Sequence, residues 1–284
     1  MKMDSLLREV LRLEPQRYSA IYDYCWDHYS YFANQRSKIL DELKGSLVKK
    51  IKSFCFENWS RIVSYKYTLD PLSAKGSVFS IGGRFNIGNI DQMKFSIFPA
   101  LYVSKTVDTA FKERYGLYSS EKKSSGLTAE EFALGGNDTI IKVSGKINQI
   151  LDLSESNILY DFFQSIRKIK LPRSFIRRAK CLNIQPMFSV PSLKSLMKTI
   201  LEPNWRQMPM HFDIPSNSQI LGQIAHAAGI EGIVYPSRMS DKDKCIAIYP
   251  ERFSNSDSFV EIIGEVAPEN KNRRLDSNSY IDFL

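Results

Sequence analysis

Residues 80–116 read SIGGRFNIGNIDQMKFSIFPALYVSKTVDTAFKERYG. This stretch places an arginine after two glycines, a tyrosine in a short apolar segment and a glutamate in a helix-like segment; these are Arg84, Tyr102 and Glu113. An arginine can hold a phosphate through two parallel hydrogen bonds, a tyrosine ring can stack on a flat heterocycle, and a carboxylate can stabilise a developing cation. A site that splits a dinucleotide at its ribosyl bond needs these three groups.

The same stretch predicts a loop, a strand and a helix in that order. GGRFNIG (82–88) is a glycine-flanked loop or the start of a strand. ALYVS (100–104) is typical of a buried strand. KTVDTAFKERYG (105–116) predicts an amphipathic helix that ends at its glycine. We therefore expect Tyr102 on a strand and Glu113 on the helix that follows it.

The rest of the chain divides by its hydrophobic pattern. Apolar residues recur at helical spacing in residues 1–56, which we expect to form a helical N-terminal extension. An aromatic stripe within it is typical of a packing face: Tyr18, Tyr22, Trp26, Tyr29 and Phe32. From residue 57 the pattern changes to short strands with turn signals. We expect a catalytic domain at 57–265 with insertions at about 117–137 and 155–203, followed by a C-terminal tail at 266–284.

Composition and charge restrict the class of protein. The chain of 284 residues is 43% hydrophobic and 25% charged, as in ordinary globular proteins. No apolar run approaches the roughly 18 residues that a membrane helix needs, and the N-terminus lacks the apolar core of a standard secretory signal. We expect no membrane association and a cytoplasmic protein, with delivery into another cell left open. The net charge of +8 suits an anionic ligand or partner such as a dinucleotide, a nucleic acid or an acidic protein.

Two further patterns argue against other functions. Residues 167–180 carry seven basic residues and no acidic one, but lack the aromatic interleaving of RNA-binding modules. A solvated, partly helical face is favoured there over a surface for nucleic acid. The four cysteines lie far apart and the three histidines are scattered, so no zinc signature is present and we expect no metal.

Generic enzyme motifs do not occur in the chain. There is no P-loop, no GxGxxG after a strand, no GxSxG and no HExxH. Hydrolysis with Ser237 as the nucleophile would require a base nearby, and neither His211 nor His226 lies in a recognised motif. The sequence therefore favours chemistry that does not depend on a histidine.

Several short motifs, in this order, resemble the RES family of bacterial toxins. They are RIVSYKY, GGRFNIG, LYVS, TAFKE, QILDLS, NWRQ and QILGQIAHAAGIEGIVYPSR. The resemblance extends from about Trp59 to about Phe253. Members of this family degrade NAD+ and are usually paired with an Xre-type antitoxin. The resemblance implies NAD+ as the substrate and an antitoxin or immunity protein as the partner.

The resemblance also implies which residues act. Arg84, Tyr102, Glu113 and Ser237 match the catalytic residues of the family, and Arg61 in the first strand would join Arg84 in holding the pyrophosphate. Glu113 would stabilise the ribosyl cation, Tyr102 would stack on the nicotinamide and Ser237 would bond its amide or ribose. The residues that bind NAD+ would thus be Arg61, Arg84, Tyr102 and Ser237. Taken without the family, Glu113 is better explained as a solvated charge on a helix face and Ser237 as an ordinary turn serine. The pattern around Tyr102 suits a core residue and a site residue equally.

The implied fold is α+β. It has an ADP-ribosyltransferase-like core of two small, mostly antiparallel sheets flanked by helices. The implied function is a toxin that cleaves the nicotinamide–ribose bond and depletes NAD+, as a glycohydrolase or a phosphorylase. One alternative is an ADP-ribosyltransferase that modifies a protein or a nucleic acid. Another is an inactive binding module.

Overall fold

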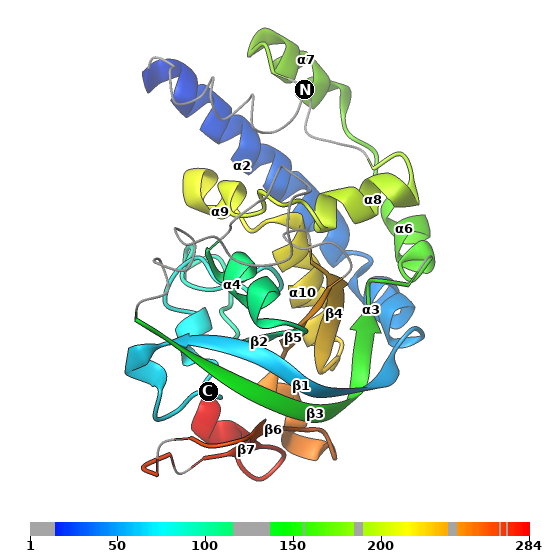
Figure 1. Cartoon of the computed structure of the whole chain (residues 1–284). Helices are drawn as coiled ribbons and strands as arrows, with labels where there is room; N and C mark the ends of the chain where they lie inside the picture. Colours follow the sequence, from blue (N-terminus) through cyan, green and yellow to red (C-terminus); the bar gives the residue numbers. More distant parts are fainter. Residues whose placement is uncertain are drawn as a thin grey trace.

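The fold mixes helices and strands, as predicted, with most of the helices gathered at one end and the strands at the other (Figure 1). The computed structural model describes residues 15–115, 137–155, 157–184, 190–237, 243–266, 268–270 and 272–284. The insertion expected at 117–137 lies outside these residues apart from its last one, Asn137. Among the helices that are described, none is both long enough and apolar enough to cross a membrane.

The described strands form one seven-stranded sheet. They are β1 (Lys52–Ser64), β2 (Leu101–Ser104), β3 (Asp138–Asp152), β4 (Gly232–Pro236), β5 (Lys244–Ile248), β6 (Phe259–Ile263) and β7 (Arg274–Leu275). The strand order is β1-β2-β5-β4-β3-β6-β7, and β1 also pairs with β3, so the first five strands close into a barrel. The prediction of two separate small sheets is therefore wrong for the described residues. The prediction of mostly antiparallel pairing is confirmed, since among these strands β3 and β4 make the one parallel pair.

The barrel closes because two long strands bend. Irregularities in the β1–β3 pairing fall between Lys52 and Phe54 and between Phe56 and Trp59. Such bulges bend a strand and increase its twist, which a sheet needs if it is to close. The far end of β3 then pairs with β4 as well as with β1, since Ile150 lies opposite both Lys52 and Gly232. An alternating sequence pattern predicts the strands, but it does not show that they meet in a ring.

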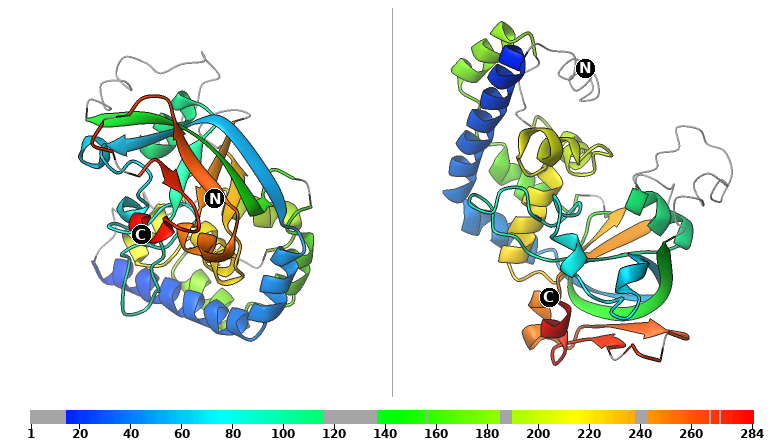
Figure 2. Two further views of the ribbon diagram at one scale, coloured as in Figure 1. Left: turned by 90° about the horizontal axis from the view of Figure 1, so that it is seen from below. Right: turned by 90° about the vertical axis from the view of Figure 1, so that its left-hand side faces the viewer.

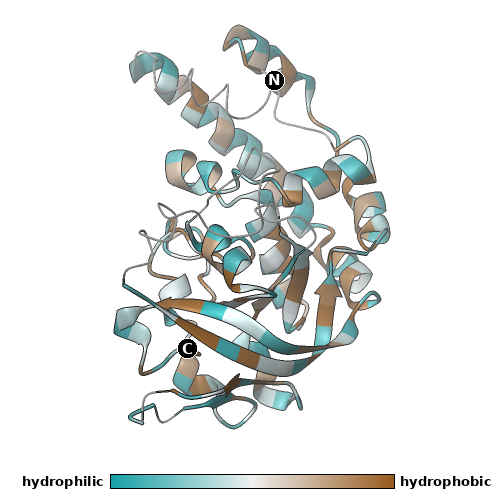
Figure 3. Ribbon diagram, viewed as in Figure 1, coloured by the Kyte–Doolittle hydropathy of each residue, from teal (hydrophilic) through white to brown (hydrophobic). Residues whose placement is uncertain are grey.

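Apolar side chains of the barrel point alternately to two cores. One core draws residues from all five barrel strands and fills the interior of the barrel. The other lies between the barrel and the helices. On β4, Val234 faces the first core while Ile233 and Tyr235 face the second, as the two-residue period of a strand requires. The apolar colouring of β4 and β5 in Figure 3 follows from this burial on both faces.

Most of the helices cover one side of the barrel, whereas α4 (Val107–Tyr115) lies apart from them against β1 and β2 (Figure 2). The other described helices are α2 (Pro15–Ser37), α3 (Leu40–Val48), α6 (Tyr160–Ile166), α7 (Arg173–Cys181), α8 (Leu193–Ile200), α9 (Gln207–Phe212) and α10 (Asn217–Ala227). Helix α10 begins at a capping box formed by Ser216 and Gln219 and is followed by Gly229 at φ +81°. The helix predicted at 105–116 is confirmed as α4.

The N-terminal helices are part of the packed body. Leu43 and Leu47 on α3 are fully buried in the core between the barrel and the helices. The aromatic stripe on α2 is a packing face, as predicted: the Trp26 ring, for example, stacks on Phe95. Strand β1 starts at Lys52, so its first residues lie before the boundary that we placed at residue 57.

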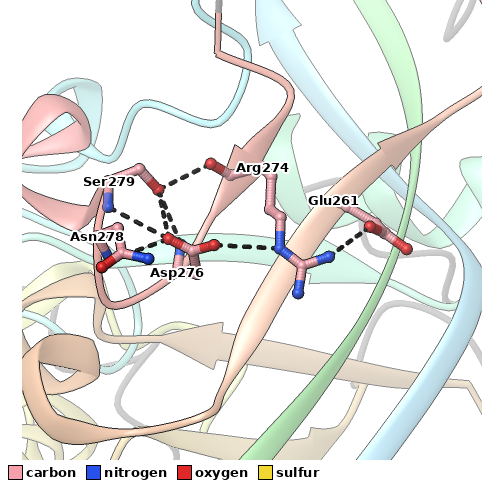
Figure 4. A network of polar contacts seen from close by, with 5 residues as sticks. All are labelled: Glu261, Arg274, Asp276, Asn278 and Ser279. Atoms are coloured by element: carbon pink, nitrogen blue, oxygen red, sulfur yellow. Dashed lines mark hydrogen bonds and ion pairs between the residues drawn. The ribbon is translucent and has the colours of Figure 1, made fainter.

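The C-terminal segment, expected as a tail, packs against the barrel. Leu275 and Phe283 are fully buried in the interior core. Figure 4 shows the polar contacts that hold β7, in which Arg274 donates to Glu261 at 2.8 Å and to Asp276 at 3.1 Å. The Ser279 hydroxyl donates to the Arg274 carbonyl at 2.8 Å. This segment therefore adds β7 to the edge of β6 that does not pair with β3.

Candidate functional site

The loop that carries Arg84 is shaped by its two glycines. Gly82 has φ +95°, and a Cβ added there would lie 2.3 Å from the Asn86 carbonyl oxygen. A Cβ on Gly83 would lie 2.4 Å from the Tyr102 hydroxyl oxygen. Asn86 closes the turn, because its side-chain oxygen accepts from the Gly83 N–H at 2.8 Å. The glycine pair thus lets the loop fold back on itself and lie directly on the Tyr102 ring.

Side chains from two other segments hold this loop from outside. Gln219 on α10 donates to the Ile81 carbonyl at 2.8 Å, and the Tyr249 hydroxyl donates to the Phe85 carbonyl at 2.9 Å. Helix α10 approaches the loop so closely that a Cβ on Gly222 would lie 2.0 Å from the Phe85 oxygen. The backbone around Arg84 is therefore fixed before any ligand binds, which is the preorganisation that a catalytic site requires.

Arg84 is a buried cation with unmet hydrogen-bonding capacity. Its side chain is 3% exposed, and its Nη1 donates to the Glu202 carbonyl at 2.8 Å. Its Nη2 lies 3.8 Å from Glu113 Oε2, and both Nε and Nη2 are buried without a hydrogen-bond partner. The rings of Trp205 and Tyr235 lie 6.0 and 5.9 Å from the guanidinium carbon. Buried donors are normally satisfied, so this arrangement marks a place for an acceptor from a ligand.

Glu113 and Ser237 meet although they lie far apart in sequence. The Ser237 hydroxyl at the end of β4 donates to Glu113 Oε1 on α4 at 2.7 Å. The other carboxylate oxygen of Glu113 faces Arg84. Three of the four predicted catalytic residues therefore form one cluster, drawn from a loop, a helix and a strand end.

Asp243 forms hydrogen bonds with both elements that carry Glu113 and Ser237, namely the start of α4 and the end of β4. Its carboxylate accepts from the hydroxyl of Thr106 at 2.7 Å and from that of Thr109 at 2.6 Å, at the start of α4. Its carbonyl accepts from the Ser237 N–H at 2.8 Å. The distance between Glu113 and Ser237 thus depends on Asp243, which bonds to both elements.

Tyr102 holds the loop in place through its hydroxyl. The hydroxyl donates to the side-chain oxygen of Asn86 at 2.9 Å and accepts from the Phe85 N–H at 2.9 Å. Burial raises the pKa of Tyr102, so the hydroxyl keeps its proton at neutral pH. Gly83 lies against the ring. The structure thus gives Tyr102 a role in positioning Arg84, and its stacking on a nicotinamide stays a prediction.

Within the described residues, the hydrogen bonds of the Arg61 side chain go to backbone carbonyls and not to Arg84, Glu113 or Ser237. Its guanidinium donates to three backbone carbonyls, those of Pro71 at 2.7 Å, Ser73 at 2.7 Å and Tyr102 at 3.1 Å. Burial lowers the pKa of Arg61 to about 10. The residue therefore joins the 71–73 segment to β2. Its role in holding a pyrophosphate stays a prediction.

Arg206 was not among the residues predicted for the site. It lies within the NWRQ motif, and its Nη2 donates to the Glu113 carbonyl at 3.2 Å. Its guanidinium carbon is 4.8 Å from the centre of the Trp205 ring. Burial, followed by the charge of Arg84, lowers the pKa of Arg206. The motif was the one signal in the sequence that could have pointed to this residue.

Other candidate groups lie in different surroundings. His226 stacks on Phe98 and pairs with Glu251, so it has a packing role. Among the described residues, no group of three His, Cys, Asp or Glu side chains could hold a metal ion. The basic helix α7 packs through Ala179 against α2, and Arg178 pairs there with Asp27.

Comparison with known proteins supports the resemblance. The family model of the RES domain matches residues 162–264, which confirms the resemblance over this part of the chain. The match includes Arg206 and Ser237, whereas Arg84, Tyr102 and Glu113 precede it. No curated protein matches the chain.

Among solved structures, the chain is similar to one from the M. tuberculosis MbcT–MbcA toxin–antitoxin complex. The two chains are 15% identical, with a TM-score of 0.44, over 85% of this chain and 96% of the other.

Proposed function

We propose that this protein binds NAD+, cleaves its nicotinamide–ribose bond and acts as a toxin by depleting NAD+. One observation carries the proposal: Ser237, Glu113 and the buried, incompletely bonded Arg84 converge at one place. An anchored carboxylate beside a cation with free donors suits a substrate that has a ribosyl bond to break and phosphates to hold.

The chemistry requires a carboxylate but no general acid. When the C1′–N bond breaks, its electron pair leaves with nicotinamide, which departs as a neutral ring. The ribose is left as an oxocarbenium-like cation, which Glu113 would stabilise as carboxylates do in glycoside hydrolysis. An oxygen of water or phosphate then bonds to C1′, and a proton is released when water is the acceptor. The glycohydrolase and phosphorylase reactions differ in this acceptor alone.

The contacts of Glu113 suit this role. Ser237 occupies Oε1, and Arg84 faces Oε2 at 3.8 Å, so the carboxylate is held by neighbours on both oxygens. Its side chain is 14% exposed, which limits the screening of its charge by water. In this proposal Arg84 binds the phosphates through its free donors, while Tyr102 and Ser237 contact the nicotinamide or the ribose.

Two finer points of the proposal follow from the resemblance to the family. We propose an ADP-ribosyltransferase-like core, for which the mostly antiparallel strands and the convergent site give support. We also propose an antitoxin or immunity protein as the partner of this chain, because RES toxins are usually paired with one. Transfer of ADP-ribose to a protein or a nucleic acid is the alternative reaction, and the basic surface of α7 would then dock the target.

The first prediction concerns Glu113. We would incubate the protein with NAD+ labelled on its adenylate, with and without phosphate and cell lysate. The wild type should release nicotinamide, and Glu113→Gln should lower this rate on the order of 100-fold or more, because the charge that stabilises the cation is lost. Glu57→Gln, a change at an exposed glutamate, should behave as the wild type. Expression of the wild type in bacteria should lower cellular NAD+ and stop growth, and Glu113→Gln should not.

The label distinguishes the reactions. Labelled ADP-ribose, or its phosphorylated form when phosphate is present, supports the glycohydrolase or the phosphorylase. Label on a protein or a nucleic acid supports the transferase. A wild type without turnover under all of these conditions would leave the inactive binding module as the remaining interpretation.

A further inference from the structure

Two guanidinium groups meet at one glutamate in this site. Arg84 Nη2 lies 3.8 Å from Glu113 Oε2, and Arg206 Nη2 donates to the Glu113 carbonyl at 3.2 Å. Arg84 also donates to the Glu202 carbonyl. Carbonyl oxygens accept hydrogen bonds but carry no net charge. The carboxylate of Glu113 therefore neutralises at most one of the two cations, and a positive charge remains.

Both cations lie against the same ring. The guanidinium carbons of Arg84 and Arg206 are 6.0 and 4.8 Å from the centre of the Trp205 ring, which is itself 3% exposed. A buried indole keeps water away from the two charges, so their repulsion is weakly screened. The lowered pKa of Arg206, caused by burial and then by the charge of Arg84, agrees with this geometry. An anion bound between them would relieve the repulsion.

The free donors of Arg84 indicate the form of that anion. Its Nε and Nη2 are buried and have no hydrogen-bond partner. These two nitrogens lie on one edge of the guanidinium plane and form a fork that suits two oxygens of one phosphate. A second guanidinium close by suits a second phosphate attached to the first.

We propose that Arg84 and Arg206 together bind the diphosphate of NAD+, with Arg206 as the second cation that contacts a phosphate. The identity of the ligand rests on the proposed function. Arg61, which was predicted for this role, instead directs three of its donors to backbone carbonyls. Arg206 also donates to the backbone carbonyl of Glu113. Binding of the diphosphate to Arg206 should therefore help to position Glu113, the residue that stabilises the ribosyl cation. A nicotinamide mononucleotide, which has a single phosphate, should therefore be a poorer substrate than NAD+.

Binding and turnover measured separately test this proposal. Calorimetry with inorganic pyrophosphate should show binding to the wild type, and Arg206→Gln should weaken it roughly tenfold or more, because a hydrogen-bonded charge is lost. Arg206→Lys should recover only part of the affinity, since an ammonium lacks the fork. The KM for NAD+ should rise in Arg206→Gln by a similar factor, while kcat falls far less than in Glu113→Gln. Arg177→Gln removes an exposed arginine on α7 and should match the wild type in pyrophosphate binding.

Three outcomes would overturn the proposal. The first is a wild type that does not bind pyrophosphate. The second is a folded Arg206→Gln variant with unchanged pyrophosphate affinity and KM. The third is a loss of thermal stability and kcat in both Arg206 variants without a change in affinity, as expected if the residue only braces α4. Pyrophosphate binding that depends on Arg206, without NAD+ cleavage, would keep this diphosphate site and remove the proposed reaction.

Discussion

Tyr102 shows how a single hydroxyl can hold the loop that carries a buried arginine, Arg84. Its oxygen lies between the Asn86 side chain and the Phe85 N–H, both in the loop that carries Arg84. A ring that merely stacked on nicotinamide would not need these two bonds. The hydroxyl and the ring of this residue therefore make separable contributions, and a phenylalanine at the same position distinguishes them.

The second prediction follows from this separation. Tyr102→Phe should lower the free energy of unfolding by about 1–2 kcal/mol, because a buried hydrogen-bonded hydroxyl is removed. Nicotinamide release should fall on the order of tenfold, because the Arg84 loop is less well held. Urea unfolding and the turnover assay measure the two effects. Tyr65→Phe, at a side chain that is 73% exposed, is the control. Full activity and stability in Tyr102→Phe would mean that the hydroxyl contributes nothing and that the role of Tyr102 lies in its ring alone.

At the scale of elements, the site depends on how α4 is docked to the end of β4. The threonines at the start of α4 donate to the Asp243 carboxylate, and the Asp243 carbonyl accepts from the Ser237 N–H at 2.8 Å. A negative charge at the N-terminus of a helix is also favourable. This contact fixes the helix that carries Glu113 relative to the strand end that carries Ser237.

The third prediction concerns this docking. Asp243→Ala should lower the free energy of unfolding by about 1–3 kcal/mol, because two hydrogen bonds to a charged acceptor are lost. It should also lower kcat, since Ser237 is no longer held at 2.7 Å from Glu113. Urea unfolding and nicotinamide release check the two effects, with Asp257→Ala as the control at an exposed aspartate. An unchanged kcat would mean that the Ser237–Glu113 bond does not depend on this docking.

At the scale of the whole molecule, the barrel is closed by a buried charge as well as by apolar packing. Asp152 at the end of β3 is 1% exposed and lies 3.2 Å from Lys52 on β1 and 3.3 Å from Lys244 on β5. Burial alone would raise the pKa of Asp152, but hydrogen bonds from Ser154 and the contacts with the two lysines bring that pKa below its ordinary value. The carboxylate thus joins three strands of the ring.

The fourth prediction is a pH dependence of stability. A native pKa below the unfolded one, near 3.9, means that ionised Asp152 stabilises the fold above about pH 4 and loses this effect as the pH falls through the native pKa. Asp152→Asn should lower the free energy of unfolding by about 1.5–3 kcal/mol at pH 7. The difference from the wild type should shrink as the pH is lowered from about 4 toward about 3. Urea unfolding at these pH values measures it, and a constant difference would contradict the assignment.

Much of the element order could be predicted because it depends on local patterns. The buried strand at Tyr102 and the helix at Glu113 both follow from side chains a few residues apart. The contact of Glu113 with Ser237 is different. It joins residues 124 positions apart, and only the resemblance to a family placed them in one site.

Periodicity, turn chemistry and motif order are properties of the chain, so they were enough to predict the segments, the glycine loop around Arg84 and the resemblance to the RES family. The tertiary structure decided that the strands close into one barrel rather than forming two sheets. It also brought Arg206 to the site and directed the donors of Arg61 to backbone carbonyls. The physical reason is that closure and charge pairing depend on which distant side chains share a buried space, and hydrophobic spacing along the chain carries no information about that.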